Sequence, residues 1–143
     1  MARAWFRAAW VAGSLIVLST VGCGGKDERV PVAKTTGKLE WPGHSVRGLM
    51  VVLHPTDPGG SKMPFQPTGV VHEDGTFAIT CYEVSDGAPA GEYVVTIRTA
   101  PLPDDVPTPK MPPAKYRDPK TSPLRVTIEK KPLNNLPPLV IAG

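Results

Sequence analysis

The chain has 143 residues, and its formal net charge of +3 comes from basic residues that are scattered along it. No aromatic ladder accompanies them, so the composition argues against a nucleic-acid-binding protein. The 18 prolines and 14 glycines lie between short apolar runs, a pattern typical of many short strands joined by turns. No segment after residue 22 keeps a 3.6-residue apolar period, so we expect little helix.

Residues 1–22 have the features of a signal peptide. Arg3 and Arg7 give a positive start, an apolar stretch follows at residues 8–18, and small or modest residues precede Cys23, as in export signals. The apolar stretch is shorter than the roughly 20 residues that span a bilayer. The sequence therefore predicts a cleaved signal rather than a transmembrane anchor.

Cys23 indicates the kind of signal. The order Val21-Gly22-Cys23 resembles the lipobox of bacterial lipoproteins, in which the peptide is cut before an acylated cysteine. Thr20 stands where a lipobox usually has leucine, so an ordinary secretory signal and an uncleaved anchor are the alternatives. Gly24 follows the cysteine in place of an acidic retention signal, and the same resemblance then favours the outer membrane over the inner one. We expect a lipid on Cys23 to hold the protein on a membrane of the cell envelope.

The rest of the chain divides into a tether and one domain. Residues 23–31 are polar and have no apolar period, so we expect a flexible tether. Residues 32–143 have the length of a single domain. With Cys23 acylated, Cys81 is the remaining cysteine, so no intrachain disulfide is expected, and we interpret Cys81 as a small buried strand residue.

The strands expected in this domain are short. The first contains Gly37, which marks a bend or bulge, and the second, "LMVVLH", is apolar enough to be covered on both faces. The expected strands span residues 32–41, 49–54, 69–72, 76–80, 92–99, 124–130 and 136–142.

A tight turn gives the clearest local signal. Asp74 and Gly75 separate the third and fourth expected strands, where glycine can take the positive φ that such a turn demands. In the strand that follows, Phe77 and Ile79 alternate with polar or small residues. We therefore expect both side chains to face the core.

Proline shapes the second half of the chain. Residues 100–123 carry many prolines and no apolar run, so we expect a long connection, in part as polyproline II. Pro137 and Pro138 restrict the last strand to an edge or to a late start. About seven short strands in one domain predict an all-β, immunoglobulin-like (prealbumin-like) antiparallel sandwich.

Four segments carry a resemblance to a known family: "TTGKLEWPGHSVRGLMVVLHP", "GVVHEDGTFAIT", "GAPAGEYVVTI" and "PPAKYRDPKTSPLRVTI". Together they resemble small lipoproteins of planctomycete-like bacteria, which are described as carboxypeptidase regulatory-like or transthyretin-like domains. The last segment is the most specific. The resemblance implies a β-sandwich at the cell envelope, and it implies no reaction, because the family label describes architecture.

The transthyretin-like label raises the hypothesis of an enzyme. Hydroxyisourate hydrolases share this fold class and end in a Tyr-Arg-Gly-Ser motif, whereas this chain ends in "LVIAG". His44, His54 and His72 lie in different sequence contexts, and none has a motif partner. A hydrolase needs a base and a charge stabiliser that converge. We therefore expect no enzyme and no cofactor.

Two further chemistries were considered and are not expected. Calcium prefers clustered oxygen ligands, but the aspartates of this chain lie in turn sequences; they are Asp74, Asp86, Asp104 and Asp105. No metal site is therefore expected. An intramolecular isopeptide bond would join Lys34 or Lys38 to Asn134 or Asn135, and the asparagines precede the last expected strand instead of lying in it.

The remaining hypotheses are two kinds of binding. A non-catalytic interaction or structural module would dock an envelope protein or peptide on an edge strand. A carbohydrate-binding module is the alternative, and it would need exposed rings to stack on sugars. The stacking candidates are Trp41, Phe65, Tyr82 and Tyr116. We interpret each of these as a packing residue and therefore favour the interaction module. The sequence does not identify its partner, which is either an envelope protein or a glycan.

The most specific segment, residues 113–124, has two interpretations. In the structural one, Tyr116 packs over the edge of the sandwich, and Asp118 and Ser122 bond nearby backbone amides. In the functional one, Lys115, Tyr116 and Arg117 are candidate ligand contacts on the surface. We favour the structural interpretation, because a tyrosine ring brings apolar area that this loop otherwise lacks.

Overall fold

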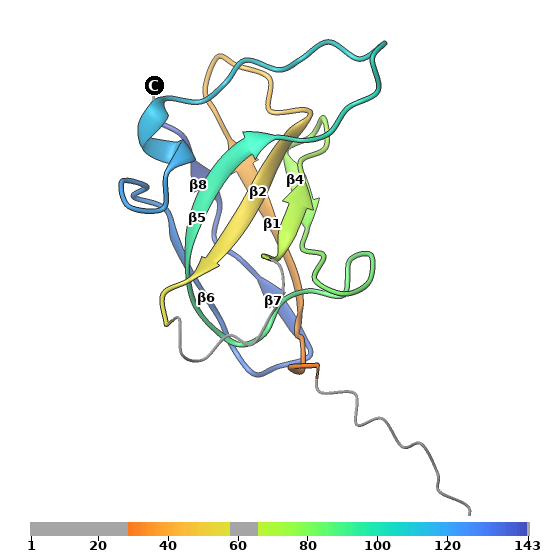
Figure 1. The fold of residues 1–143 in the computed structure, drawn as a ribbon, viewed down its shortest axis with the longest axis vertical. Helices are drawn as coiled ribbons and strands as arrows, with labels where there is room; N and C mark the ends of the chain where they lie inside the picture. The colour runs from red at the N-terminus through yellow and green to blue at the C-terminus, as the bar shows by residue number, and fades with distance from the viewer. Residues whose placement is uncertain (1–28, 58–65, 143) are drawn as a thin grey trace, which may run out of the picture.

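A computed structural model describes residues 29–57 and 66–142 (Figure 1). The expected signal peptide, Cys23 and Phe65 lie outside the described residues. No helix in the described ranges is long and apolar enough to cross a membrane. The elements are β1 (Lys34–Glu40), β2 (Leu49–Pro55), β3 (Thr68–Val70), β4 (Thr76–Ala78), β5 (Gly91–Thr99), the 3₁₀ turn η1 (Ala114–Arg117), β6 (Arg125–Ile128), β7 (Leu133–Asn135) and β8 (Leu139–Val140).

The strands form two sheets, which confirms the predicted all-β sandwich. One sheet has the order β3-β2-β5-β6, and the other has the order β4-β1-β7 with β8 also paired to β1. The sheets are not antiparallel throughout, because β1 pairs in parallel with both β7 and β8. Parallel neighbours need a long connection, and most of the chain separates β1 from these two strands.

The last strand is divided. Segments β7 and β8 lie on the same side of β1, and the register shifts by one residue between them. Pro137 and Pro138 occupy the interruption, because proline has no N–H to donate to the ladder. The prediction of an edge position with a late start is confirmed, and β7 is an additional strand that the sequence did not predict.

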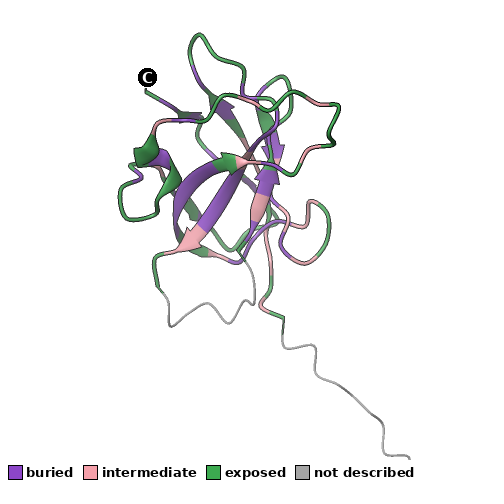
Figure 2. Ribbon diagram, turned by 45° about the horizontal axis from the view of Figure 1, so that its top comes forward, coloured by how far each residue is buried: buried purple, intermediate pink, exposed green. Residues whose placement is uncertain are grey.

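The hydrophobic core lies between the sheets (Figure 2). In β5 the side chains of Tyr93, Val95 and Ile97 are at most 3% exposed, as their alternation predicted. The opposite face of this sheet is also covered in part, since Val52 of β2 and Thr96 of β5 are at most 2% exposed. The prediction that β2 is covered on both faces is therefore confirmed.

Gly37 serves close packing and marks no bulge. It pairs with Phe77 in an unbroken β1–β4 register. A Cβ atom on Gly37 would lie 2.5 Å from Cζ of Phe77, which is too close for any side chain. The predicted bulge is therefore wrong, and the glycine is needed because the aromatic ring lies against the β1 backbone.

The predicted tight turn is present at Asp74 and Gly75. Gly75 has φ +85°, and its N–H donates to the carbonyl of His72 at 3.0 Å. The Asp74 carboxylate accepts from the N–H and the hydroxyl of Thr76. Phe77 and Ile79 are buried as predicted. One feature differs from a simple hairpin: β3 pairs with β2 and β4 with β1, so this turn joins the two sheets.

A single carboxylate organises the loop after β4. Asp86 accepts hydrogen bonds from the backbone N–H groups of Cys81, Tyr82 and Glu83 at 2.7–3.0 Å. Partial burial opposes ionisation, but these three donors hold the pKa of Asp86 below its ordinary value. Cys81 is buried, as predicted, but lies in this loop and not in a strand. Burial first and the Asp86 charge second raise the pKa of its thiol to about 11, so the thiol is protonated and poorly nucleophilic.

Candidate functional site

Three connections gather at one end of the sandwich (Figure 1). They are residues 41–48 between β1 and β2, residues 71–75 between β3 and β4, and residues 100–113 between β5 and η1. The first described residues lie at the opposite end. We call the gathered end the loop end, and it holds two adjoining cavities.

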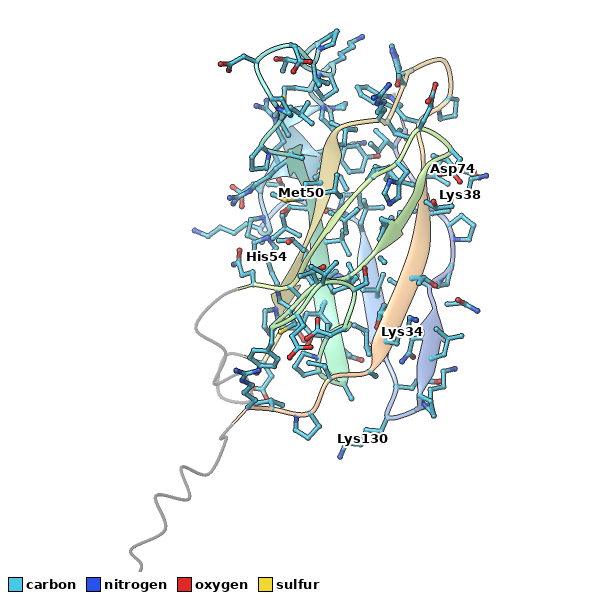
Figure 3. All side chains as sticks on the ribbon, turned by 90° about the vertical axis from the view of Figure 1, so that its right-hand side faces the viewer. Lys34, Lys38, Met50, His54, Asp74 and Lys130 are labelled. Carbon is cyan, nitrogen blue, oxygen red and sulfur yellow. The ribbon has the colours of Figure 1, made fainter. Side chains whose placement is uncertain are left out.

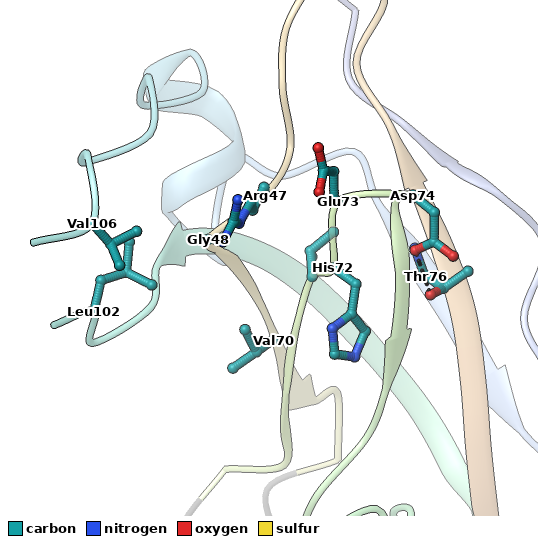
Figure 4. A pocket seen from close by; sticks show the side chains of 10 residues that line it. Arg47, Gly48, Val70, His72, Glu73, Asp74, Thr76, Leu102 and Val106 are labelled. Atoms are coloured by element: carbon teal, nitrogen blue, oxygen red, sulfur yellow. Dashed lines mark hydrogen bonds between the residues drawn. The ribbon is translucent and has the colours of Figure 1, made fainter.

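The larger cavity has a volume of about 680 Å³ and lies between the β3–β4 turn and the proline-rich connection (Figure 4). Its lining combines apolar and charged side chains. They include Arg47, Val70, His72, Glu73, Leu102 and Val106. Leu102 and Val106 lie on one side of Arg47, Val70 lies below it, and the charged turn lies on the other side.

The smaller cavity has a volume of about 410 Å³ and shares Arg47 and Val106 with the larger one. Basic and hydroxyl-bearing residues dominate its polar lining, with one acid among them. They are His44, Ser45, Arg47, Asp105, Thr108 and Lys110.

Gly48 joins the three connections. Its N–H donates to the carbonyl of Val71 at 3.2 Å, and its carbonyl accepts from the N–H of Ala100 at 2.9 Å. Its φ of +80° favours glycine, and an added Cβ would lie 2.9 Å from Cδ1 of Leu102. The walls of the larger cavity are thus positioned by one residue that cannot carry a side chain without displacing them.

Trp41 packs below the basic residues of the smaller cavity. The side chain is 6% exposed, and its ring centroid lies 4.3 Å from that of His44. The Lys110 ammonium lies 5.8 Å from the centroid of the Trp41 ring, a cation–π distance. Within the described residues the indole Nε1 is buried without a hydrogen-bond partner. Trp41 is therefore the common neighbour of His44 and Lys110.

Arg47 and Lys110 at the loop end form no ion pair with an acid in the described part of the chain. The ion pairs found there lie elsewhere in the domain, and they join Arg29 to Glu83, Lys38 to Glu40 and Lys131 to Glu129. Arg47 and Lys110 belong to none of them. Their charges are therefore available to a ligand.

The sequence-predicted contacts around Tyr116 lie away from these cavities. Tyr116 is 1% exposed, and its hydroxyl accepts the N–H of Ala142 at 2.8 Å. The Lys115 ammonium lies 5.0 Å from the centroid of the Tyr116 ring, and Lys115 and Arg117 are exposed. The buried ring that the structural interpretation predicted is confirmed, and only the two basic side chains are accessible to a ligand.

The polar side chains after Tyr116 bond the backbone, as the sequence predicted. The Asp118 carboxylate accepts the N–H of Lys120 at 2.8 Å. The Ser122 hydroxyl donates to the carbonyl of Val95 and accepts the N–H of Leu124 at 3.3 Å. These bonds fix the segment that leads into β6.

The stacking candidates within the described residues are not open to a sugar. Trp41 and Tyr116 are buried. Tyr82 is half-buried, its hydroxyl accepts the N–H of Val30, and the Arg29 guanidinium lies 5.4 Å from its ring centroid. None of the aromatic rings in the described ranges is fully exposed. This arrangement gives the carbohydrate hypothesis little support.

The histidines occupy two different places. His54 lies on the outer face of β2 (Figure 3), where its Nε2 and Thr96 Oγ1 are 2.8 Å apart and its Nδ1 and Gln66 Nε2 are 2.9 Å apart. Burial and then the Arg98 charge lower the pKa of His54. His44 and His72 line the two cavities. No local pattern indicated that these two histidines lie at one end.

The other candidate chemistries have no support in the described residues. No group of three or more His, Cys, Asp or Glu side chains there could hold a metal ion. The Asn134 amide bonds the backbone N–H and carbonyl of Glu129, and the Asn135 Oδ1 accepts the hydroxyl of Thr36. Both asparagines are therefore occupied by contacts other than the lysines of β1.

Comparison with known proteins adds one structural likeness. No family model and no curated protein matches the chain. A crystal structure of a DUF3823 family protein from Parabacteroides merdae is similar over 76% of this chain, with a TM-score of 0.40 and 19% sequence identity. The chain spans about half the length of that protein, 46% of which is covered. The fold and the site together define an all-β sandwich with a cavity-bearing loop end.

Proposed function

We propose that the protein is a lipid-anchored envelope protein whose β-sandwich is a non-catalytic interaction module. The observation that carries this proposal is the placement of the loop end opposite the first described residues (Figure 1). A tether of residues 23–31 from a lipid on Cys23 would direct the cavities away from the membrane surface. The resemblance to small envelope lipoproteins agrees with this arrangement.

The polar groups of the cavities also favour binding over catalysis. Within the described residues, no hydrogen bond joins the side chain of His44 or His72 to a carboxylate or a hydroxyl. A general base needs such an orienting partner or a nucleophile within reach. The carbohydrate-binding alternative has less support than a protein partner, because the described aromatic rings are buried or half-buried.

The lipid anchor is tested by Cys23→Ala in the full chain. We expect this variant to leave the membrane fraction, because the acyl chains provide the anchoring free energy. Cys81→Ala is the matched control and should stay with the membranes, since its thiol is buried in the domain. If Cys23→Ala still sediments with membranes after a high-salt wash, the lipoprotein assignment is wrong.

The interaction role is tested by photo-crosslinking in the native envelope. A benzophenone side chain would replace Asp105 at the loop end or, as the matched control, Lys130 in the turn between β6 and β7, at the other end (Figure 3). We expect a discrete cross-linked species from position 105 and none from position 130. Equal labelling from both positions, or none from either, would contradict an interaction module that uses its loop end.

A further inference from the structure

We propose that the two adjoining cavities form one groove that binds the C-terminal segment of an extended peptide, with the terminal carboxylate at Arg47, Lys110 and His44. The inference rests on the proposed interaction role and names the chemistry of the partner. Three properties of the groove carry it: a basic end, an apolar wall beside it and an acidic far end.

The basic end is suited to a carboxylate. His44, Arg47 and Lys110 line the smaller cavity, with Asp105 as its one acidic lining residue. Neither Arg47 nor Lys110 is in an ion pair with a described acid. Arginine binds carboxylates through two parallel N–H···O bonds, and lysine acts as a point charge beside it. A terminal carboxylate would be an ion-pair partner for both side chains.

The arrangement around Trp41 keeps this end in place. Its ring contacts that of His44 at a 4.3 Å centroid separation and carries the Lys110 ammonium at 5.8 Å. Both side chains are exposed and lie against a ring that is itself 6% exposed. A pre-organised site loses less side-chain freedom on binding than one built from mobile lysines.

The wall of the groove beside the basic end is apolar. Arg47 and Val106 line both cavities, and Leu102 and Val70 extend the apolar lining into the larger one. Val70 is 46% exposed although it is a large apolar residue. Figure 4 shows Leu102 and Val106 on one side of Arg47 and Val70 below it. An apolar side chain next to the terminal carboxylate would cover this surface.

The far end of the larger cavity is acidic. Glu73 and Asp74 lie on the β3–β4 turn, and both are exposed. A lysine upstream in the peptide would complement them, so charge on the ligand runs opposite to charge along the groove. A small inorganic anion would use only the basic end, and a sugar would find no open aromatic ring. An extended peptide with a free C-terminus uses all three parts.

The test uses the full chain in detergent micelles and a fluorescein-labelled peptide that ends in Lys-Gly-Leu-Val. Fluorescence polarisation would compare the peptide with a free carboxylate and the same peptide with a C-terminal amide. We expect the carboxylate form to bind the unaltered chain and the amide to bind it at least tenfold more weakly. The carboxylate form should also bind Arg47→Gln and Lys110→Gln at least tenfold more weakly than it binds the unaltered chain. The matched control is Arg117→Gln, an exposed arginine of η1, which should bind as the unaltered chain does.

Several results would overturn the assignment. The proposal is wrong if the carboxylate peptide does not bind, if both peptides bind equally, or if Arg117→Gln loses binding. Displacement of the peptide by inorganic phosphate, together with tight binding of the amide, would instead indicate an anion site. Thermal unfolding of Arg47→Gln and Lys110→Gln would show that each is folded. Persistent cross-linking at position 105 without peptide binding would refute the groove but not the interaction role, whereas loss of cross-linking would refute the role.

Discussion

Tyr116 closes the open side of the sandwich with one side chain. The turn η1 lies against β5, and the Tyr116 hydroxyl is bonded to Ala142 just after β8. One residue therefore links the two sheets on the side where β6 and the divided last strand do not pair with each other. A tyrosine suits this position because its ring supplies apolar area and its hydroxyl satisfies a backbone N–H.

At the residue scale we predict that Tyr116→Ala lowers the free energy of unfolding by about 3 kcal/mol, since a large buried ring is lost. Tyr116→Phe keeps the ring and should cost about 1 kcal/mol for the hydrogen bond. Lys115→Ala and Arg117→Ala are the surface controls and should change little. Chemical denaturation measures all four, and an unshifted midpoint in Tyr116→Ala would contradict the structural role.

The roles of some residues can be predicted from the sequence, and those of others cannot. Burial of Tyr116 follows from its chemistry, because no other large apolar side chain lies in residues 113–123. The groove residues Arg47 and Lys110 escaped prediction because each is an ordinary surface residue until the fold brings two distant connections together. Gly37 was misinterpreted for a related reason, since its need to stay small comes from the ring of Phe77 on another strand.

The β3–β4 turn connects the two sheets and also forms a wall of the larger cavity. Substitution of Gly75 is unfavourable, because its φ is +85° and an added Cβ would lie 2.6 Å from the carbonyl oxygen of Leu39. Any side chain at this position must move either the turn or β1. The turn chemistry was predictable from Asp74 and Gly75, whereas the assignment of its two strands to different sheets depends on distant partners.

We predict that Gly75→Val lowers the free energy of unfolding by roughly 1 kcal/mol or more, through a positive φ forced on a β-branched residue and the clash with Leu39. Gly43→Val is the matched control. Gly43 has a similar φ of +78° but nothing within 4 Å of an added Cβ, so this variant reports the backbone strain alone. Urea titrations should rank Gly75→Val as the less stable of the two, and equal stability would contradict the predicted clash.

Strand positions were easier to predict than strand partners. The boundaries of β2 and β5 follow from apolar runs and alternation, which are local properties. The parallel pairing of β1 with β7 and β8 depends on the crossover of the chain between the sheets, and no local pattern encodes it. Pro137 and Pro138 did indicate an edge, because their effect on hydrogen bonding is local.

At the scale of the whole molecule, two ionisable groups in the core limit stability at high pH. Burial raises the pKa of the Tyr93 phenol to about 12 from 10.0, and burial with the Asp86 charge raises that of the Cys81 thiol to about 11 from 9.0. The Tyr93 hydroxyl also donates to the carbonyl of Pro89 at 2.7 Å. Both groups are therefore kept neutral by the folded state.

The sign of the pH dependence follows from proton uptake. Below pH 9 both groups are protonated in the folded and the unfolded chain, so their contribution is fully present. As pH rises, the unfolded chain releases these protons first, and the contribution is lost through pH 11 for Cys81 and pH 12 for Tyr93.

We predict that the urea midpoint of the unaltered chain falls steadily from pH 9 to 11. In Tyr93→Phe and in Cys81→Ala the urea midpoint should fall less over this pH range, and in the double variant it should fall least. At pH 7.5 the free energy of unfolding of Tyr93→Phe should already be about 1 kcal/mol lower, because its hydrogen bond is lost. Parallel curves for all four chains would show that the alkaline limit lies in other groups.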